Sequence, residues 1–116
     1  MGDNMVKKIA IIEIGSNNTK THIYEDDNLI SENNMTIEFK KNYKKENKIQ
    51  SSDLDKLYDV IKFALEYTEN VNIYGCSIFR NITDQELNEI NKNLKEKFNL
   101  QERQYIAYLK VAEKYV

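Results

Sequence analysis

The sequence predicts a single α/β domain in which three antiparallel strands are followed by a helix, a parallel strand and one or two further helices. Three observations support this prediction. A β-branched apolar run near the N-terminus breaks at a glycine and resumes as an alternating segment, which is typical of strand, turn and strand. An amphipathic run in the middle of the chain indicates a helix. A second apolar strand follows that helix, as in a parallel crossover connection.

Length and composition set the outer limits. The chain of 116 residues fits one domain, residues 1–116, with room for a core but not for a second domain. The formal net charge of −2, without a long basic block, argues against nucleic acid as a partner. The sequence has no signal region and no apolar run of membrane-spanning length, so we expect no membrane partner. The single Cys76 has no second cysteine to pair with, which favours a cytoplasmic location.

The N-terminal segment predicts the first pair of strands. Residues 9–14 are almost continuously apolar, which predicts a central strand covered on both faces. Glu13 lies near the end of that strand, where a buried carboxylate needs a partner. Residues 19–24 alternate between polar and apolar, which predicts a second strand that is less covered.

The turn at residues 15–18 has two interpretations. Gly15 permits backbone conformations that other residues avoid, and successive amides in such a turn can point into one concavity and bind a phosphate. Ser16, Asn17 and Thr19 add short side chains that hydrogen-bond to oxygen atoms. The alternative is an ordinary hairpin turn, in which Gly and Asn are expected for conformational reasons. Spacing alone favours the ordinary turn.

A third strand is predicted at residues 34–40, where apolar and polar side chains alternate, after a turn at residues 25–28. The basic run at residues 40–48 is interpreted as a solvated loop. The functional alternative is that its positive charge steers a polyanion toward the Gly15 turn.

The second half of the chain predicts helix, strand and helix. A helix is expected from an N-cap at residues 51–52 to about residue 70. Residues 71–77 then alternate as a strand, which we expect to lie parallel to the first strand, so that the two strands end side by side. The loop at residues 78–81 carries Arg80, whose planar fork matches phosphate oxygens, although a lone loop arginine is more often a surface charge.

The C-terminal region begins with a clear helix signal. Thr83 and Glu86 form a capping box, which predicts a helix from Asp84 to about Asn99. Residues 101–116 fit either a helix or a short final strand, and the helix is slightly favoured because good helix formers are frequent there.

Two of these segments resemble the Ppx/GppA family of exopolyphosphatases and guanosine pentaphosphate phosphohydrolases, which belongs to the actin-like ATPase superfamily. The family's first phosphate-binding segment reads Asp, Ile or Leu, Gly, Ser, Asn and Ser or Thr. Gly15, Ser16 and Asn17 match it, whereas Glu13 stands in the place of the Asp. Residues 75–80 resemble a later segment that reads Gly or Ala, any residue, Ser or Thr, two more residues and Arg.

The resemblance implies a ribonuclease-H-like fold that is incomplete relative to the family. It implies that Gly15, Ser16, Asn17 and Arg80 bind phosphate. It also implies Mg²⁺ as a cofactor, with Glu13 as the candidate metal ligand.

The resemblance further implies a catalytic candidate. The family has paired glutamates near this point, of which the second activates the attacking water. When the family pattern is aligned on Tyr108 and Leu109, the pair falls on Glu102 and Arg103, so Glu102 remains as the candidate catalytic residue. The family's second phosphate-binding segment would begin beyond residue 116. Phosphoryl transfer needs the phosphate held from both sides, so whether this chain is an enzyme stays open.

Two functions of different classes follow. In the first, the chain is the phosphate-binding part of a phosphoanhydride hydrolase that acts on polyphosphate or guanosine pentaphosphate, with little turnover by itself. In the second, it is a catalytically inactive interaction or regulatory domain that keeps the fold. In either case, the exposed edge of a small sheet favours a homo-oligomer.

Overall fold

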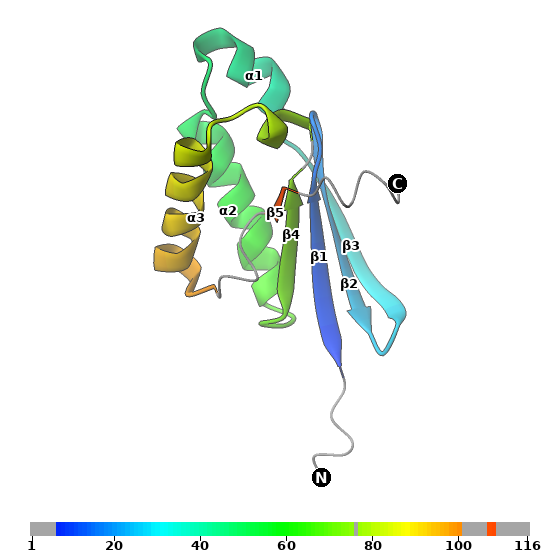
Figure 1. Ribbon diagram of the computed structural model, residues 1–116. Helices are drawn as coiled ribbons and strands as arrows, with labels where there is room; N and C mark the ends of the chain where they lie inside the picture. The colour runs from blue at the N-terminus through cyan, green and yellow to red at the C-terminus, as the bar shows by residue number, and fades with distance from the viewer. Residues whose placement is uncertain (1–6, 76, 101–106, 109–116) are drawn as a thin grey trace.

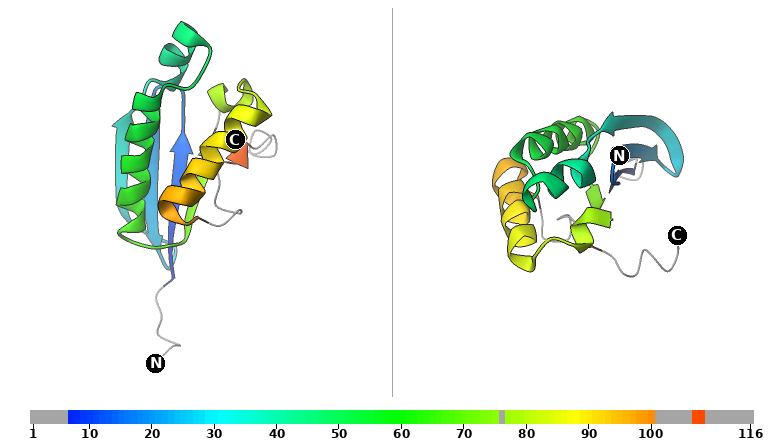
Figure 2. Two further views of the ribbon diagram at one scale, coloured as in Figure 1. Left: turned by 90° about the vertical axis from the view of Figure 1, so that its left-hand side faces the viewer. Right: turned by 90° about the horizontal axis from the view of Figure 1, so that it is seen from above.

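The computed structural model describes residues 7–75, 77–100 and 107–108. The strands form one sheet in the order β3-β2-β1-β4-β5. Helix α2 packs on this sheet and α3 lies beside α2 on the same side (Figures 1 and 2). In chain order the elements are β1 (Lys8–Ile14), β2 (Asn18–Glu25), β3 (Asn28–Thr36), α1 (Phe39–Glu46), α2 (Ser51–Leu65), β4 (Val71–Gly75), the 3-10 helix η2 (Ser77–Arg80), α3 (Asp84–Phe98) and β5 (Ala107–Tyr108).

The first three strands form the predicted antiparallel meander, in which β2 pairs with β1 and with β3. The turn between β2 and β3 is tight, because Asp26 and Asp27 both have positive φ, at 48° and 70°. This confirms the turn expected at residues 25–28. The third strand was wrongly placed at residues 34–40, because pairing starts directly after the tight turn, with Asn28 opposite Glu25. In the first half of β3 the apolar residues Leu29 and Ile30 are adjacent and polar residues follow, so there is no alternation that would reveal a strand.

The parallel pairing of β4 with β1 confirms the predicted strand, helix, strand connection. Next to β4, the pair Ala107–Tyr108 forms a fifth strand in parallel with Tyr74–Gly75. The slight preference for a helix was therefore wrong at these two positions. Residues 101–106 and 109–116 lie outside the described part of the chain.

The basic segment after β3 is a helix, α1, and not the solvated loop that its charge suggested. Phe39 and Tyr43 lie one helical turn apart and form its inner face, with Phe39 fully buried and Tyr43 packed against the core. Asn47 ends the helix in the left-handed conformation, at φ 57°, and its amide donates to the Tyr43 carbonyl. Two apolar contacts and a C-cap therefore help to order a segment that is otherwise dominated by lysine.

Helix α2 differs from the prediction at both ends. Its N-cap is Gln50, in extended conformation, rather than a serine at residues 51–52. The helix also stops short of residue 70. After the helix, the Thr68 hydroxyl donates to the Lys8 carbonyl at 3.2 Å and accepts from the Asn70 amide at 3.0 Å. These two bonds direct the chain into β4.

Helix α3 begins and ends where the sequence predicts. The Thr83 hydroxyl accepts a hydrogen bond from the Glu86 amide at 3.1 Å, and Asn99 ends the helix in the left-handed conformation. The Glu86 carboxylate does not return to the cap. It accepts from the Ile49 amide at 2.8 Å and so ties α3 to the connection between α1 and α2.

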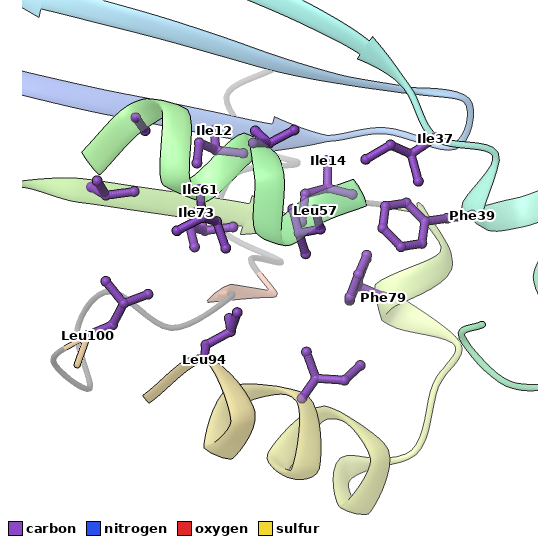
Figure 3. Packing of buried hydrophobic residues seen from close by; sticks show 14 of the residues in the cluster. Ile12, Ile14, Ile37, Phe39, Leu57, Ile61, Ile73, Phe79, Leu94 and Leu100 are labelled. Carbon is purple, nitrogen blue, oxygen red and sulfur yellow. The ribbon is translucent and has the colours of Figure 1, made fainter. Parts of the chain in front are cut away.

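The core lies between the sheet and the helices, as Figure 3 shows. Along β1 the buried residues alternate, so only one face of this strand is covered among the described residues. The prediction of a strand covered on both faces was therefore wrong, and Glu13 is exposed. The largest fully buried side chains are those of Phe39, Phe79, Ile12, Ile14, Ile23, Ile37, Leu57, Ile61, Ile73 and Leu94.

Candidate functional site

The two segments that carry the candidate phosphate ligands leave the sheet at the same end, where β1 and β4 both finish. Ile14 at the end of β1 is the Cα partner of Gly75 at the end of β4. The turn at residues 15–18 and the 3-10 helix η2 therefore start from neighbouring strand ends, as the parallel crossover predicts. In open sheets of this kind, sites form where the carboxyl ends of the strands meet.

Gly15 is required by a close approach and not by an unusual φ. Its amide donates to the Asn18 carbonyl at 2.8 Å, which closes the turn. No glycine in the described residues has positive φ, so the conformational reason predicted for Gly15 is wrong. A Cβ atom at this position would lie 3.0 Å from the Asn18 carbonyl oxygen, which is tighter than nine in ten Cβ contacts, so that carbonyl would have to shift by a few tenths of an ångström. We therefore expect a larger residue at position 15 to distort the turn.

The turn is held from outside by the chain that leaves β3. The Ile37 amide donates to the Asn17 carbonyl at 3.1 Å, and the Lys40 amide donates to the Ser16 carbonyl at 3.3 Å. The Asn18 carbonyl is bonded to Gly15, so all three turn carbonyls are used inside the fold. The side chain of Asn17 is exposed and that of Ser16 is half-buried. The turn is thus fixed in shape, while a concavity lined by its amides stays a prediction.

The strand that follows the turn carries two buried hydroxyls, of which the sequence singled out only Thr19, as an oxygen-binding side chain beside the turn. Thr19 and Thr21 are both 0% exposed, and within the described residues neither Oγ1 atom has a hydrogen-bond partner. The visible signal was the alternation of Thr19, Thr21 and Ile23, which places all three on the apolar face of β2. A buried hydroxyl without a partner is costly, so these two atoms are points of weakness in the core.

The second candidate segment, η2, is fixed through Phe79. Its ring packs edge-to-face on Phe39 of α1, with ring centroids 5.6 Å apart and an angle of 71° between the planes. Ile78 is buried as well. Arg80 is the last residue of η2, so its backbone starts from an anchored turn. The Arg80 side chain lies outside the described part of the structure, and its role as a phosphate ligand stays a prediction.

A buried acid holds α1 in place. Asp53, in the first turn of α2, is 1% exposed, and both of its carboxylate oxygens accept from the Asn42 amide nitrogen, at 2.9 and 3.2 Å. The start of a helix also favours a negative charge. The sequence revealed Asp53 only as a first-turn acid, because its partner lies on an element that was not expected to be a helix. Through this contact, α1 is fixed to α2 beside the candidate turn.

The described residues do not form a metal site by themselves. Glu13 is exposed and has Lys20 and Tyr74 as its Cα partners on the two neighbouring strands. Within residues 7–75, 77–100 and 107–108, no group of three or more His, Cys, Asp or Glu side chains could hold a metal ion. Mg²⁺ needs several oxygen ligands, so a single exposed carboxylate beside a lysine on the neighbouring strand does not fit a resident Mg²⁺. Glu102, the catalytic candidate, lies outside the described residues.

A separate surface between α2 and α3 contains Tyr58. Burial raises the pKa of Tyr58 above its ordinary value of 10.0 and the nearby Asp55 raises it further, whereas a hydrogen bond with Asn93 lowers it. The ring also contacts Phe98, and the Lys97 ammonium lies 5.1 Å from its centre. These contacts fix the two helices against each other on the outer side of the domain.

No helix in the described ranges is both long and apolar enough to cross a membrane.

Comparison with known proteins identifies the fold. Neither the protein-family models nor the curated proteins contain a match to this sequence. Among solved structures, a Ppx/GppA family member from Aquifex aeolicus matches with a TM-score of 0.68 and 18% identity, over 90% of this chain and 35% of the other. An exopolyphosphatase-like protein matches with a TM-score of 0.71 and 12% identity, over 95% and 34%. An exopolyphosphatase from Cytophaga hutchinsonii matches with a TM-score of 0.61 and 15% identity, over 88% and 33%.

These similarities confirm the fold that the sequence resemblance implied. The chain has the α/β architecture of the Ppx/GppA structures and spans about a third of their length. At 12–18% identity the likeness concerns the fold alone.

Proposed function

We propose that this chain is the phosphate-binding part of a phosphoanhydride hydrolase that acts on inorganic polyphosphate or guanosine pentaphosphate. Ser16 and Asn17 hold the terminal phosphate on one side, in a turn that Gly15 closes through its bond to the Asn18 carbonyl, and Arg80 approaches it from the neighbouring strand end. The observation that supports this proposal is the Cα pairing of Ile14 with Gly75. Because these residues end β1 and β4, both segments begin at the same end of the sheet.

The chemistry of these residues suits an anion. The exposed Asn17 amide group donates hydrogen bonds, and an arginine fork donates two parallel bonds to phosphate oxygens. A turn that is already fixed by hydrogen bonds loses little entropy when a ligand binds. In this proposal Glu102 activates water, but a phosphate held from one side only is turned over slowly. The expected setting is the cytoplasm.

No step of the proposal depends on a resident metal. Mg²⁺ enters only as an ion that accompanies the phosphate, with Glu13 as the residue that would contact it. Because Glu13 alone does not form a metal site, binding of phosphate and binding of Mg²⁺ should be separable.

The second candidate function is an inactive interaction domain, possessing the fold without the chemistry. It is favoured by the outer edge of β3, which no strand of the described residues covers and where Leu29 and Ile30 are 49% and 42% exposed. An uncovered strand edge with exposed apolar side chains can pair with another chain, and a second copy of this chain is the partner that we propose. This candidate predicts self-association without phosphate binding.

Isothermal calorimetry with tripolyphosphate, with and without Mg²⁺, separates the two candidates. The proposal predicts saturable binding that Arg80→Ala weakens about 10- to 150-fold, the usual effect of losing a charged hydrogen bond. Gly15→Val should abolish binding because it distorts the turn. Lys92→Ala is the matched control, since it removes an exposed cation from the outer helix α3.

Each variant is first checked by circular dichroism, so that a loss of binding is not a loss of folding. No heat in the wild type, together with dimers in analytical ultracentrifugation, would refute the phosphate proposal in favour of the interaction domain. Equal losses in Arg80→Ala and Lys92→Ala would show that net charge alone is responsible.

A further inference from the structure

We propose that α1 is a polyanion-binding helix, whose lysine face holds the phosphates that follow the terminal one along an inorganic polyphosphate chain. This inference rests on the proposed function for the position of the terminal phosphate. Four lysines carry it: Lys40, Lys41, Lys44 and Lys45.

The four lysines share one face of the helix. At about 100° of rotation per residue, they fall within an arc of roughly 140°, and all four side chains are exposed. The buried Phe39 and the half-buried Asn42 and Tyr43 lie on the opposite side. The face that anchors α1 and the face that carries the charge are therefore different, so an anion can bind without moving the helix.

The charge of this face is largely uncompensated. The chain has a net charge of −2, but α1 carries four lysines and one glutamate, a local charge of +3. Within the described residues, Lys41 pairs with Glu38 at 3.7 Å, and no carboxylate lies at ion-pair distance from the other three lysines. Like charges this close repel one another, and a bound polyanion relieves that repulsion.

The lysine face starts at the candidate turn. The Lys40 amide donates to the Ser16 carbonyl at 3.3 Å, so the first lysine of the face is bonded to the phosphate-binding turn. Figure 1 shows α1 beyond the ends of β1 and β4, at the end of the sheet where both candidate segments leave it. From Lys40 to Lys45 the helix advances about 7.5 Å along its axis. The face therefore extends the site away from the turn in one direction.

The helix is held as a rigid support. Asp53 binds Asn42 and Phe79 packs on Phe39, both on the side of α1 opposite the lysines. A chain of phosphates that reaches the turn and continues along α1 meets four cations, whereas a single orthophosphate meets only the turn. The inference therefore predicts that affinity rises with the length of the polyphosphate.

The test compares long-chain inorganic polyphosphate with orthophosphate, which has no following phosphates, on the whole chain. The variant K40Q/K41Q/K44Q/K45Q removes the lysine face, and glutamine preserves helix propensity. The matched control K56Q/K62Q/K92Q/K95Q removes four exposed lysines from α2 and α3, with the same change in net charge. If the quadruple variant loses its helical circular dichroism, the doubles K40Q/K44Q and K41Q/K45Q replace it.

We expect the α1 variant to lose about 10- to 20-fold in affinity for the long chain, because four exposed charge contacts each contribute a factor of about two. Its affinity for orthophosphate should stay within about twofold, and the control should keep its preference for the long chain. Equal losses in the control, or no length dependence in the wild type, would overturn the inference. So would equal affinity for a single-stranded oligonucleotide of the same charge.

The design also separates this inference from the proposed function. Orthophosphate binding that Gly15→Val abolishes, without any advantage of the long chain, supports the turn and overturns the role of α1. Long-chain binding that depends on the α1 lysines, with no binding of orthophosphate, supports α1 and refutes the turn.

Discussion

Thr21 offers a direct test of the core as described, because its replacement by valine should stabilise the protein. The Thr21 hydroxyl is fully buried and has no hydrogen-bond partner among the described residues. Valine has nearly the same shape and the same β-branched preference for strands, so packing against Ile12, its Cα partner on β1, is preserved. The variant differs from the wild type chiefly in the absence of one desolvated polar group.

The size of the effect follows from the cost of that group. A buried hydroxyl without a partner costs about 1–3 kcal/mol in mutational data. We take the lower end, about 1 kcal/mol, because the strand can shift slightly to relieve the atom. For a domain of this length, 1 kcal/mol corresponds to a rise in Tm of about 4 °C.

Urea denaturation followed by circular dichroism measures this change. The midpoint should rise while the slope m stays constant, since the surface exposed on unfolding does not change. Thr36→Val is the control, because the Thr36 hydroxyl is exposed and donates to the Asn18 side chain at 3.4 Å. A Thr21→Val variant that is less stable than wild type would refute the reasoning, since it would mean that the hydroxyl has a partner.

Three further predictions concern single contacts. Glu86→Ala should lower the free energy of unfolding by about 1–3 kcal/mol in urea denaturation, because it leaves the buried Ile49 amide without its acceptor, whereas Glu86→Gln should lose less. Asp53→Ala should release α1 and raise hydrogen exchange in residues 39–46 more than elsewhere, and uniform exchange would contradict this. The Tyr58 pKa should lie above 10.0 in an NMR titration, and Asp55→Asn should lower it. Because the unfolded chain ionises first, the part of stability that depends on neutral Tyr58 is present below pH 10.0 and is lost as the pH rises through the raised pKa.

Elements with a local signal were predictable from the sequence. The break at Gly15 between an apolar run and an alternating run predicts the first hairpin. The Thr83 cap predicts the exact residue at which α3 begins. Helix α1 was not predictable in this way. Its sequence is mostly lysine, and only Phe39 and Tyr43 form an apolar side. Asn42 is held by Asp53, which lies 11 residues further along the chain.

The site was predictable in its placement but not in its detail. The rule for parallel crossovers is enough to place the Gly15 turn beside the segment that leads to Arg80. Which face of β1 is covered depends on where the helices pack, so the exposure of Glu13 could not be predicted from a run of apolar neighbours. The close contact that requires Gly15 and the unpaired hydroxyl of Thr19 likewise depend on atoms of other segments.

The backbone bonds that fix the Gly15 turn have a kinetic consequence. Two of them come from the Ile37 and Lys40 amides, which lie 20 and 24 positions after the Asn17 and Ser16 carbonyls that they contact. Such contacts form only after β3 and α1 have docked, because closing a longer loop costs more entropy. A ligand that recognises the completed turn would then stabilise the native state without assisting the transition state. Phosphate should therefore slow the unfolding of this domain and leave its folding rate nearly unchanged.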